Sequence, residues 1–162
     1  MKHPILILAI FTAALAGCKD SEPKLSEPSD TKEIEMVDFK TIIDYIGIID
    51  DKYTIDSTIY ISNGNFEGKN STQFYIVGKI NNLGYVTKIP NNNTEWESSV
   101  AVKVGYGYVA RTGFSLKYNY YRFFVAKKGQ GIDPMEFGMI PNDPYFKFPS
   151  YIVRYQFPFI AE

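Results

Sequence analysis

Apolar and polar residues alternate in short segments along the chain from Met36 onward, with turn-forming residues between the segments. Alternation with a period of two is typical of half-buried β-strands. The segments with this pattern are residues 59–61, 73–80, 85–89, 100–104 and 151–157, and residues 118–127 form the strongest apolar run, with Arg122 near its middle. Asn63-Gly64-Asn65 and Asn81-Asn82-Leu83-Gly84 fall between segments and predict tight turns.

The alternation also assigns side chains to faces of the predicted strands. In residues 73–80, one face carries Phe74, Ile76 and Ile80, and the other carries Tyr75 and Val77. In the last strand, the side chains predicted to share one face are Tyr151, Val153, Tyr155 and Phe157. Residues 100–104, where valines alternate with other residues, predict a half-buried strand.

Two segments fit the strand pattern less well. Residues 36–50 partly match a helical spacing, but their many β-branched residues favour strands. Residues 128–149 show no alternation and carry four prolines, so they predict a long loop. A loop of about twenty residues in a compact domain is more often functional or mobile than idle.

The N-terminal residues have the three parts of a bacterial signal peptide: a positive start, an apolar run and small residues before Cys18. Leu15-Ala16-Gly17-Cys18 matches the lipobox, which predicts cleavage after Gly17 and acylation of the Cys18 thiol. The apolar stretch is too short to cross roughly 30 Å of hydrocarbon as a helix. We therefore expect the membrane to be a partner through acyl chains on Cys18.

Residues 18–35 are charged and rich in proline and serine, which predicts a disordered, lipid-anchored tether. The expected organisation is a signal peptide over residues 1–17, the tether over 18–35 and one β-rich domain over 36–162. Lys19-Asp20-Ser21-Glu22 resembles the export signals of Bacteroidota surface lipoproteins, although Ser21 interrupts the acidic pair. We expect an outer-membrane protein exposed on the cell surface, with a periplasm-facing position as the alternative.

Composition narrows the fold class. Tyrosine (13 residues) and phenylalanine (12) are abundant beside a single tryptophan, and such aromatic enrichment favours strands. We predict an all-β fold, either a single antiparallel β-sandwich or a small, partly open barrel.

The formal charge of −1 becomes −2 when Lys2 leaves with the signal peptide, and this near-neutral balance argues against nucleic acid as a partner.

Five short motifs follow one another along the chain. They are residues 74–80 (FYIVGKI), 83–90 (LGYVTKIP), 100–102 (VAV), 105–111 (GYGYVAR) and 153–159 (VRYQFPF). As a set, they resemble a family of small Bacteroidota lipoproteins with a β-rich domain of unknown function. The resemblance covers residues 36–159 and implies the localisation and fold class, without an activity. The chain departs from the family at Tyr106, where relatives often have histidine, and at Gly131-Ile132, where they often have Gly-Gly-Ile.

Several chemistries are excluded by residue type. The only histidine, His3, leaves with the signal peptide, and the only thiol, on Cys18, is consumed by lipid. The usual nucleophilic triads and the usual zinc, copper and haem sites therefore lack their side chains. We expect no catalytic residue, no metal and no cofactor.

A hydrolase or a calcium site built from carboxylate side chains is a less favoured alternative. A hydrolase with paired acids would draw on Asp50, Asp51, Asp56, Glu95, Glu97, Asp133, Glu136 and Asp143. An oxygen-only calcium site at Asp133 and Asp143, or at Asp50 and Asp51, is also open, although no calcium-loop motif is present.

The candidate ligand-binding residues are Trp96, Tyr106 and Tyr108. Trp96 lies between two glutamates after a polar loop, where an exposed indole would stack on a sugar ring; the alternative that we favour is that it closes one end of the fold. The segment 105–108 (GYGY) lacks the third glycine of a nucleotide loop, so we interpret its glycines as a β-bulge or a close approach between strands. Asp56-Ser57-Thr58 is similar to a Bacteroidota O-glycosylation acceptor.

These observations favour a non-catalytic surface binding module for a glycan or a protein. A structural or assembly subunit of an envelope complex is the main alternative.

Overall fold

The computed structural model of this chain describes residues 24–39, 51–114, 117–140 and 143–161. The predicted signal peptide, Cys18 and residues 40–50 lie outside these ranges. The strands are β1 (Lys32–Val37), β2 (Ile59–Ser62), β3 (Asn65–Gly68), β4 (Gln73–Lys79), β5 (Val100–Ala101), β6 (Tyr106–Phe114), β7 (Lys117–Lys128) and β8 (Ser150–Gln156). Short 3-10 helices lie between them: η1 (Asp51–Tyr53), η2 (Leu83–Tyr85), η3 (Asn93–Glu95) and η4 (Pro134–Phe137).

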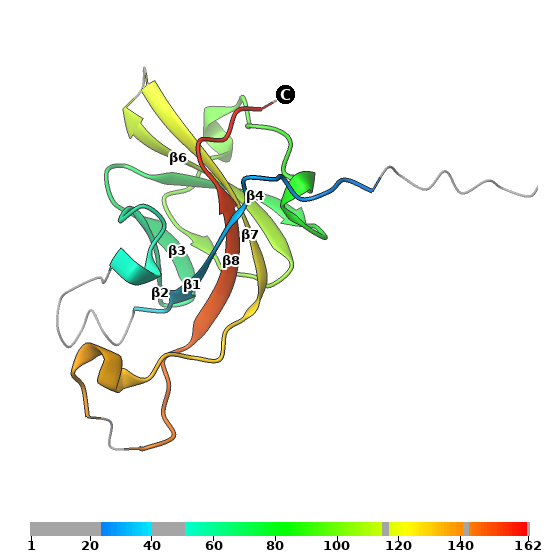
Figure 1. The fold of residues 1–162 in the computed structure, drawn as a ribbon. Helices are drawn as coiled ribbons and strands as arrows, with labels where there is room; N and C mark the ends of the chain where they lie inside the picture. The colour runs from blue at the N-terminus through cyan, green and yellow to red at the C-terminus, as the bar shows by residue number, and fades with distance from the viewer. Residues whose placement is uncertain (1–23, 40–50, 115–116, 141–142, 162) are drawn as a thin grey trace, which may run out of the picture.

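The strands form two antiparallel sheets that pack as a sandwich (Figure 1). One sheet has the order β1-β8-β7-β6-β4, and the smaller one has the order β2-β3-β5. The predicted all-β sandwich is confirmed, and the sheets do not close into a barrel. A backbone hydrogen bond of 2.8 Å from Phe39 to Ile61 joins the residues after β1 to β2.

Aromatic side chains from both sheets pack against one another in the core between the sheets. Phe66 of β3 lies 5.1 Å from the ring of Tyr108 and 4.8 Å from the ring of Phe123, measured between ring centroids. Tyr108 and Phe123 stack on each other across β6 and β7. Aromatic pairs of this kind add to the free energy gained by burying their area.

The predicted faces of β8 are confirmed, because the four side chains predicted to share one face all pack on the core between the sheets: Tyr151, Val153, Tyr155 and Phe157. The prediction for residues 73–80 is correct for Phe74 and Ile76 but wrong for Ile80. A register shift between Ile76 and Gly78 marks a β-bulge in β4, and Ile80 packs on the outer face of the large sheet. The extra residue of a bulge reverses the alternation beyond it.

Of the predicted strands, one is absent and another is shorter than expected. Residues 85–89 form no strand; Leu83–Tyr85 is η2, and the chain then crosses the outer face of the large sheet, where Val86 is buried. The strand expected over 100–104 is limited to Val100–Ala101, and Val104 is exposed. Of the predicted glycine roles, the close approach is confirmed at Gly107, where an added Cβ would lie 2.3 Å from Ile80 Cδ1.

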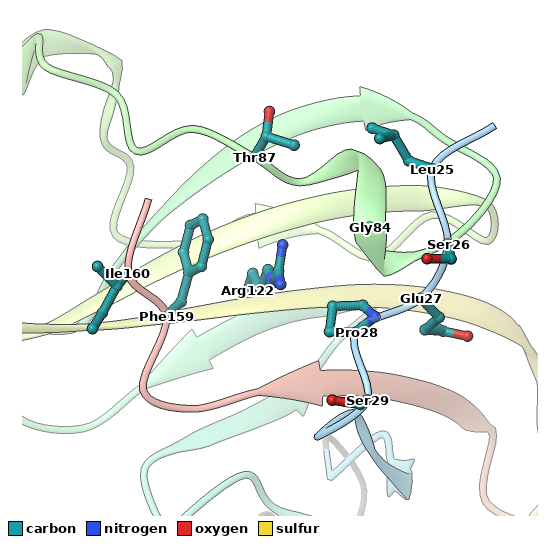
Figure 2. Close-up of a pocket in the computed structure, with 10 residues that line it drawn as sticks. All are labelled: Leu25, Ser26, Glu27, Pro28, Ser29, Gly84, Thr87, Arg122, Phe159 and Ile160. Atoms are coloured by element: carbon teal, nitrogen blue, oxygen red, sulfur yellow. The ribbon is translucent and has the colours of Figure 1, made fainter. Parts of the chain in front are cut away.

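The predicted boundary between tether and domain at residue 36 is wrong. β1 begins at Lys32 and pairs with β8 through six residues, from Lys32–Tyr155 to Val37–Ser150. Residues before β1 also contact the domain (Figure 2), because Glu27 accepts a hydrogen bond from Arg154 and Asp30 accepts one from Gln156. Alternating Ile34 and Met36 pack on the core, so tertiary burial outweighs the polar composition of this segment.

Candidate functional site

Tyr108 is fully buried and is therefore not available to a ligand at the surface. Its hydroxyl donates a 2.9 Å hydrogen bond to the carbonyl of Ala101 and accepts a 2.8 Å hydrogen bond from the amide of Lys103. Burial raises the pKa of Tyr108 to about 12. The prediction of Tyr108 as a binding residue is wrong because its side chain fills the core and ties down the residues after β5.

Trp96 is also buried, on the outer face of the large sheet. The guanidinium of Arg111 lies 4.4 Å from the Trp96 ring and 4.6 Å from the Tyr118 ring. Arg111 also donates hydrogen bonds to Gln73 and Asn93. Trp96 thus covers a face of the large sheet rather than presenting an open stacking surface. Its burial agrees with the structural interpretation favoured from the sequence, but it lies on the face of the sheet and not at an end of the fold.

The three predicted aromatics do not form one site. Tyr106 and Tyr108 point toward the core between the two sheets, whereas Trp96 packs on the opposite face of the large sheet. Tyr106 is half-buried, and Lys103 Nζ lies 5.4 Å above its ring. No shared binding surface connects these residues in the described part of the chain.

The acidic side chains of the described residues also form no metal-binding group. Within the described ranges, no three His, Cys, Asp or Glu side chains form a group that would hold a metal ion. Asp133 and Asp143, the calcium candidates, each accept a hydrogen bond from a nearby backbone amide, of Met135 and of Tyr145 respectively. In the turn 56–58, Asp56 and Ser57 are exposed, so the predicted glycosylation acceptor is accessible to solvent.

The predicted long loop has a defined structure instead. It links β7 to β8, and its two limbs are joined by hydrogen bonds of 2.9 and 3.0 Å between Ile132 and Phe148. Beyond this bridge lies η4, which begins after Asp133 with Pro134 and ends at Gly138 in the left-handed conformation (φ 71°). An Asp cap, an early proline and a final glycine are common helix boundary signals.

One side of this loop packs on the rest of the molecule. Phe148 is buried, and Phe137 and Met139 pack with it on Phe39 and Tyr53. Figure 1 shows the loop, in orange, projecting beyond the end of the two sheets. Packing on one side therefore fixes the loop while its other side faces outward.

A polar contact also holds the loop in place. Tyr53 of η1 donates a hydrogen bond of 2.5 Å to Glu136, and Lys52 forms an ion pair of 3.0 Å with the same carboxylate. The Tyr53 hydrogen bond, followed by the one from Lys52, lowers the pKa of Glu136. The ion pair is solvent-exposed, so its contribution to stability is small.

Four large apolar side chains of the loop are exposed. Their exposed fractions are 69% for Met135, 92% for Ile140, 91% for Tyr145 and 42% for Phe146. We call these four residues the apolar tip. Sequence reasoning identified the loop by its length and prolines but not these residues, because no periodicity distinguishes outward from inward side chains in a loop.

The apolar tip lies at the end of the large sheet that is opposite the N-terminal segment. The chain enters β1 at Lys32, which pairs with Tyr155, whereas the loop joins β8 at Ser150, which pairs with Val37. Residues 24–31 and the loop are therefore separated by the length of β1, on the order of 20 Å at about 3.3 Å per residue.

Comparisons with known protein families, with characterised proteins and with solved structures find no match to this chain. Among the described residues, no helix combines the length and apolar character needed to span a bilayer.

Proposed function

We propose that this protein is a lipid-anchored, non-catalytic binding module whose apolar tip contacts a protein partner. The observation that carries this proposal is the exposure of Met135, Ile140, Tyr145 and Phe146 on one projecting loop. Large apolar side chains exposed on one loop are unfavourable in water and are characteristic of interaction surfaces. The contacts of η4 with η1 hold the loop before binding, which lowers the entropic cost of association.

The chemistry of the tip favours a protein over a glycan. Met135 and Ile140 have no flat face on which a sugar ring stacks, and methionine adapts its shape to an apolar partner surface. Aromatic residues such as Tyr145 and Phe146 are frequent anchors of protein interfaces. Trp96, the residue most suited to a sugar ring, is buried under Arg111.

The proposed membrane attachment would orient the apolar tip relative to the membrane. Acyl chains on Cys18 would hold the N-terminal side of the domain near an outer membrane, as the resemblance to Bacteroidota lipoproteins implies. The loop at the opposite end of the large sheet would then point away from that membrane. The proposed location is the cell surface; in a periplasm-facing protein the same loop would point to other envelope proteins.

The two proposed roles differ in the lifetime of the complex. A surface capture module would bind its partner reversibly, whereas an assembly subunit of an envelope complex would remain bound to a fixed partner. Both roles use the apolar tip and require no cofactor, so the surface can be tested before the roles are separated.

Photo-crosslinking in living cells tests the surface. A photoreactive phenylalanine analogue at Tyr145 should form a discrete covalent product with another protein. The same analogue at Lys117, an exposed residue at the other end of β7, is the matched control and should form none. Equal products at both positions, or none at Tyr145, would contradict the proposed surface.

A further inference from the structure

The turn between β2 and β3 carries the only Asn-Gly pair of the sequence, Asn63-Gly64. Because Ser62 pairs with Asn65, these two residues alone form the turn. Their φ values of 52° and 73° lie in the left-handed region, as a two-residue hairpin turn requires. Asn63 is exposed and Gly64 is half-buried. The pair is therefore held in one conformation at a place that water reaches.

An Asn-Gly pair has its own spontaneous chemistry. The amide nitrogen of Gly64 attacks the side-chain carbonyl carbon of Asn63, and the new bond closes a five-membered succinimide. The bond from that carbon to the side-chain nitrogen breaks, and ammonia leaves with the proton of the Gly64 amide. Water then opens the ring and leaves aspartate or isoaspartate in place of Asn63. The reaction consumes one water, releases one ammonia and needs no oxidant or reductant.

The group that would be attacked is open to the reaction. Within the described ranges, no hydrogen bond engages the side-chain amide of Asn63. Gly64 adds no steric barrier, since it has no side chain and a Cβ built on it would find no atom within 4 Å beyond its chain neighbours. Neither the exposure of Asn63 nor the space around Gly64 therefore prevents ring closure.

The attacking nitrogen, in contrast, is held by Asp38. The amide of Gly64 donates a 2.7 Å hydrogen bond to one carboxylate oxygen of Asp38, and the amide of Asn63 donates one of 2.7 Å to the other. The carbonyl of Gly64 accepts a 2.9 Å hydrogen bond from the amide of Val102. Attack requires the Gly64 nitrogen to lose its proton and to turn toward the side chain of Asn63. A charge-assisted hydrogen bond opposes the loss of the proton, and the bonds on both sides of Gly64 oppose the rotation.

We propose that Asn63 is a deamidation site whose reaction Asp38 suppresses. Asp38 follows β1 and lies outside the hairpin, so the protection comes from the tertiary fold and not from the turn itself. It is lost whenever the segment after β1 leaves the turn. The site does not depend on the apolar tip or on the proposed membrane anchor.

Either product changes the turn. Aspartate in place of Asn63 adds a negative charge near the carboxylate of Asp38, which weakens the hydrogen bonds that this carboxylate accepts. Isoaspartate adds a methylene to the backbone, which a two-residue turn between Ser62 and Asn65 does not accommodate. Deamidation therefore loosens the β2–β3 hairpin and with it the smaller sheet.

Mass spectrometry of the full chain tests this proposal. The chain is incubated in mildly alkaline buffer and digested, and the deamidated fraction at Asn63 is followed with time. We expect Asp38→Ala to raise the rate at Asn63 about tenfold, which corresponds to about 1.4 kcal/mol of lost protection. Enzymatic methylation of isoaspartate should label the same peptide, because only the succinimide route produces isoaspartate.

The chain contains an internal control in the turn between β3 and β4. Asn70-Ser71 is also exposed and also has positive φ values, of 57° and 56°. Its rate should be the same in Asp38→Ala as in the unmodified chain. Asp30→Ala removes a carboxylate that contacts Gln156 and should leave the rate at Asn63 unchanged.

A faster reaction at both asparagines would show that Asp38→Ala has unfolded. The unmodified chain then decides the question, because unfolding in denaturant should accelerate the reaction at Asn63 at least about tenfold. Two results would overturn the proposal: a rate at Asn63 that is unchanged or lower in folded Asp38→Ala, or equal rates at Asn63 in the native and the unfolded chain. Neither result bears on crosslinking at Tyr145, so this proposal and the protein-binding surface fail separately.

Discussion

Arg111 connects three segments that are distant in the sequence. Its buried guanidinium lies between Trp96 and Tyr118 and donates hydrogen bonds to Gln73 and Asn93. A buried cation with aromatic and amide partners is stabilising only while these partners surround it. The residue therefore fixes the segment around η3 on the outer face of the large sheet.

Replacement of Arg111 by methionine, which keeps most of the volume, should lower the free energy of unfolding by about 2–4 kcal/mol. Trp96 is the only tryptophan, so its fluorescence should shift to longer wavelength as water reaches the ring. Arg154→Met is the control; its ion pairs with Glu27 and Glu33 are partly exposed, so the loss should stay below about 1 kcal/mol. Equal losses in the two variants would contradict the role of Arg111.

The Tyr108 hydroxyl supports the strand that precedes it. Tyr108→Phe should lower the free energy of unfolding by about 1–3 kcal/mol, because the carbonyl of Ala101 and the amide of Lys103 lose a buried partner. Chemical denaturation measures this loss. Tyr75→Phe, at a half-buried ring that packs on Trp96, is the control and should leave the free energy of unfolding nearly unchanged. An unchanged free energy of unfolding in Tyr108→Phe would show that the Tyr108 hydroxyl is dispensable.

At the level of elements, the turn between β2 and β3 depends on a side chain from outside the hairpin. Both carboxylate oxygens of Asp38 accept 2.7 Å hydrogen bonds, from the amides of Asn63 and Gly64. Asn63 and Gly64 have positive φ values of 52° and 73°, as a tight hairpin turn requires. Asp38 thus links the end of β1 to the smaller sheet.

Asp38→Ala should destabilise the protein by about 1–3 kcal/mol, since charge-assisted hydrogen bonds to two amides are lost. Hydrogen exchange at the amides of Asn63 and Gly64 should accelerate. Asp30→Ala, which removes an exposed contact with Gln156, serves as the comparison and should leave this turn protected. Unchanged exchange at Asn63 and Gly64 in Asp38→Ala would argue against the link.

The sequence was informative for elements whose pattern is local. Alternation predicted β2, β4 and β8, an apolar run predicted β7, and Asn63-Gly64 predicted the turn between β2 and β3. It failed at Ile80, because a single bulge at Gly78 changes the face, and at residues 85–89, whose apolar side chains cover a sheet instead of joining one. It also missed β1, whose pairing with β8 joins residues about 120 positions apart.

For the molecule as a whole, buried tyrosines predict loss of stability in alkali. Burial raises the pKa of six tyrosines above the ordinary value of 10: Tyr53, Tyr60, Tyr108, Tyr121, Tyr151 and Tyr155. The fold therefore favours the neutral phenols. Their contribution to stability is complete below about pH 10 and is lost as the pH rises through the folded-state pKa values, which reach about 12 for Tyr108.

Denaturation at several pH values checks this prediction. The free energy of unfolding should fall steeply between about pH 10 and pH 12, and Tyr108→Phe should make the fall shallower. A free energy that is constant across this range would contradict the account of the buried tyrosines.

The candidate site was less predictable than the fold. Aromatic residues were abundant, but the sequence did not distinguish the buried Trp96 and Tyr108 from the exposed Tyr145 and Phe146. Exposure depends on which side of the loop packs on Phe39 and Tyr53, and that is decided by contacts between distant segments. Length and proline content singled out the loop that carries the proposed surface, but its exposed residues became apparent only in the three-dimensional structure.

The most direct test of the protein-binding surface compares two exposed isoleucines at opposite ends of the molecule. Ile140 is 92% exposed on the apolar tip, and Ile160 is 82% exposed beside Arg122. With the photoreactive analogue at Tyr145, Ile140→Ser should reduce the crosslinked product about tenfold, as expected when an interface loses an anchor worth about 1.4 kcal/mol. Ile160→Ser should leave the product unchanged. Equal yields from the two variants would contradict the account and show that the apolar tip does not bind the partner.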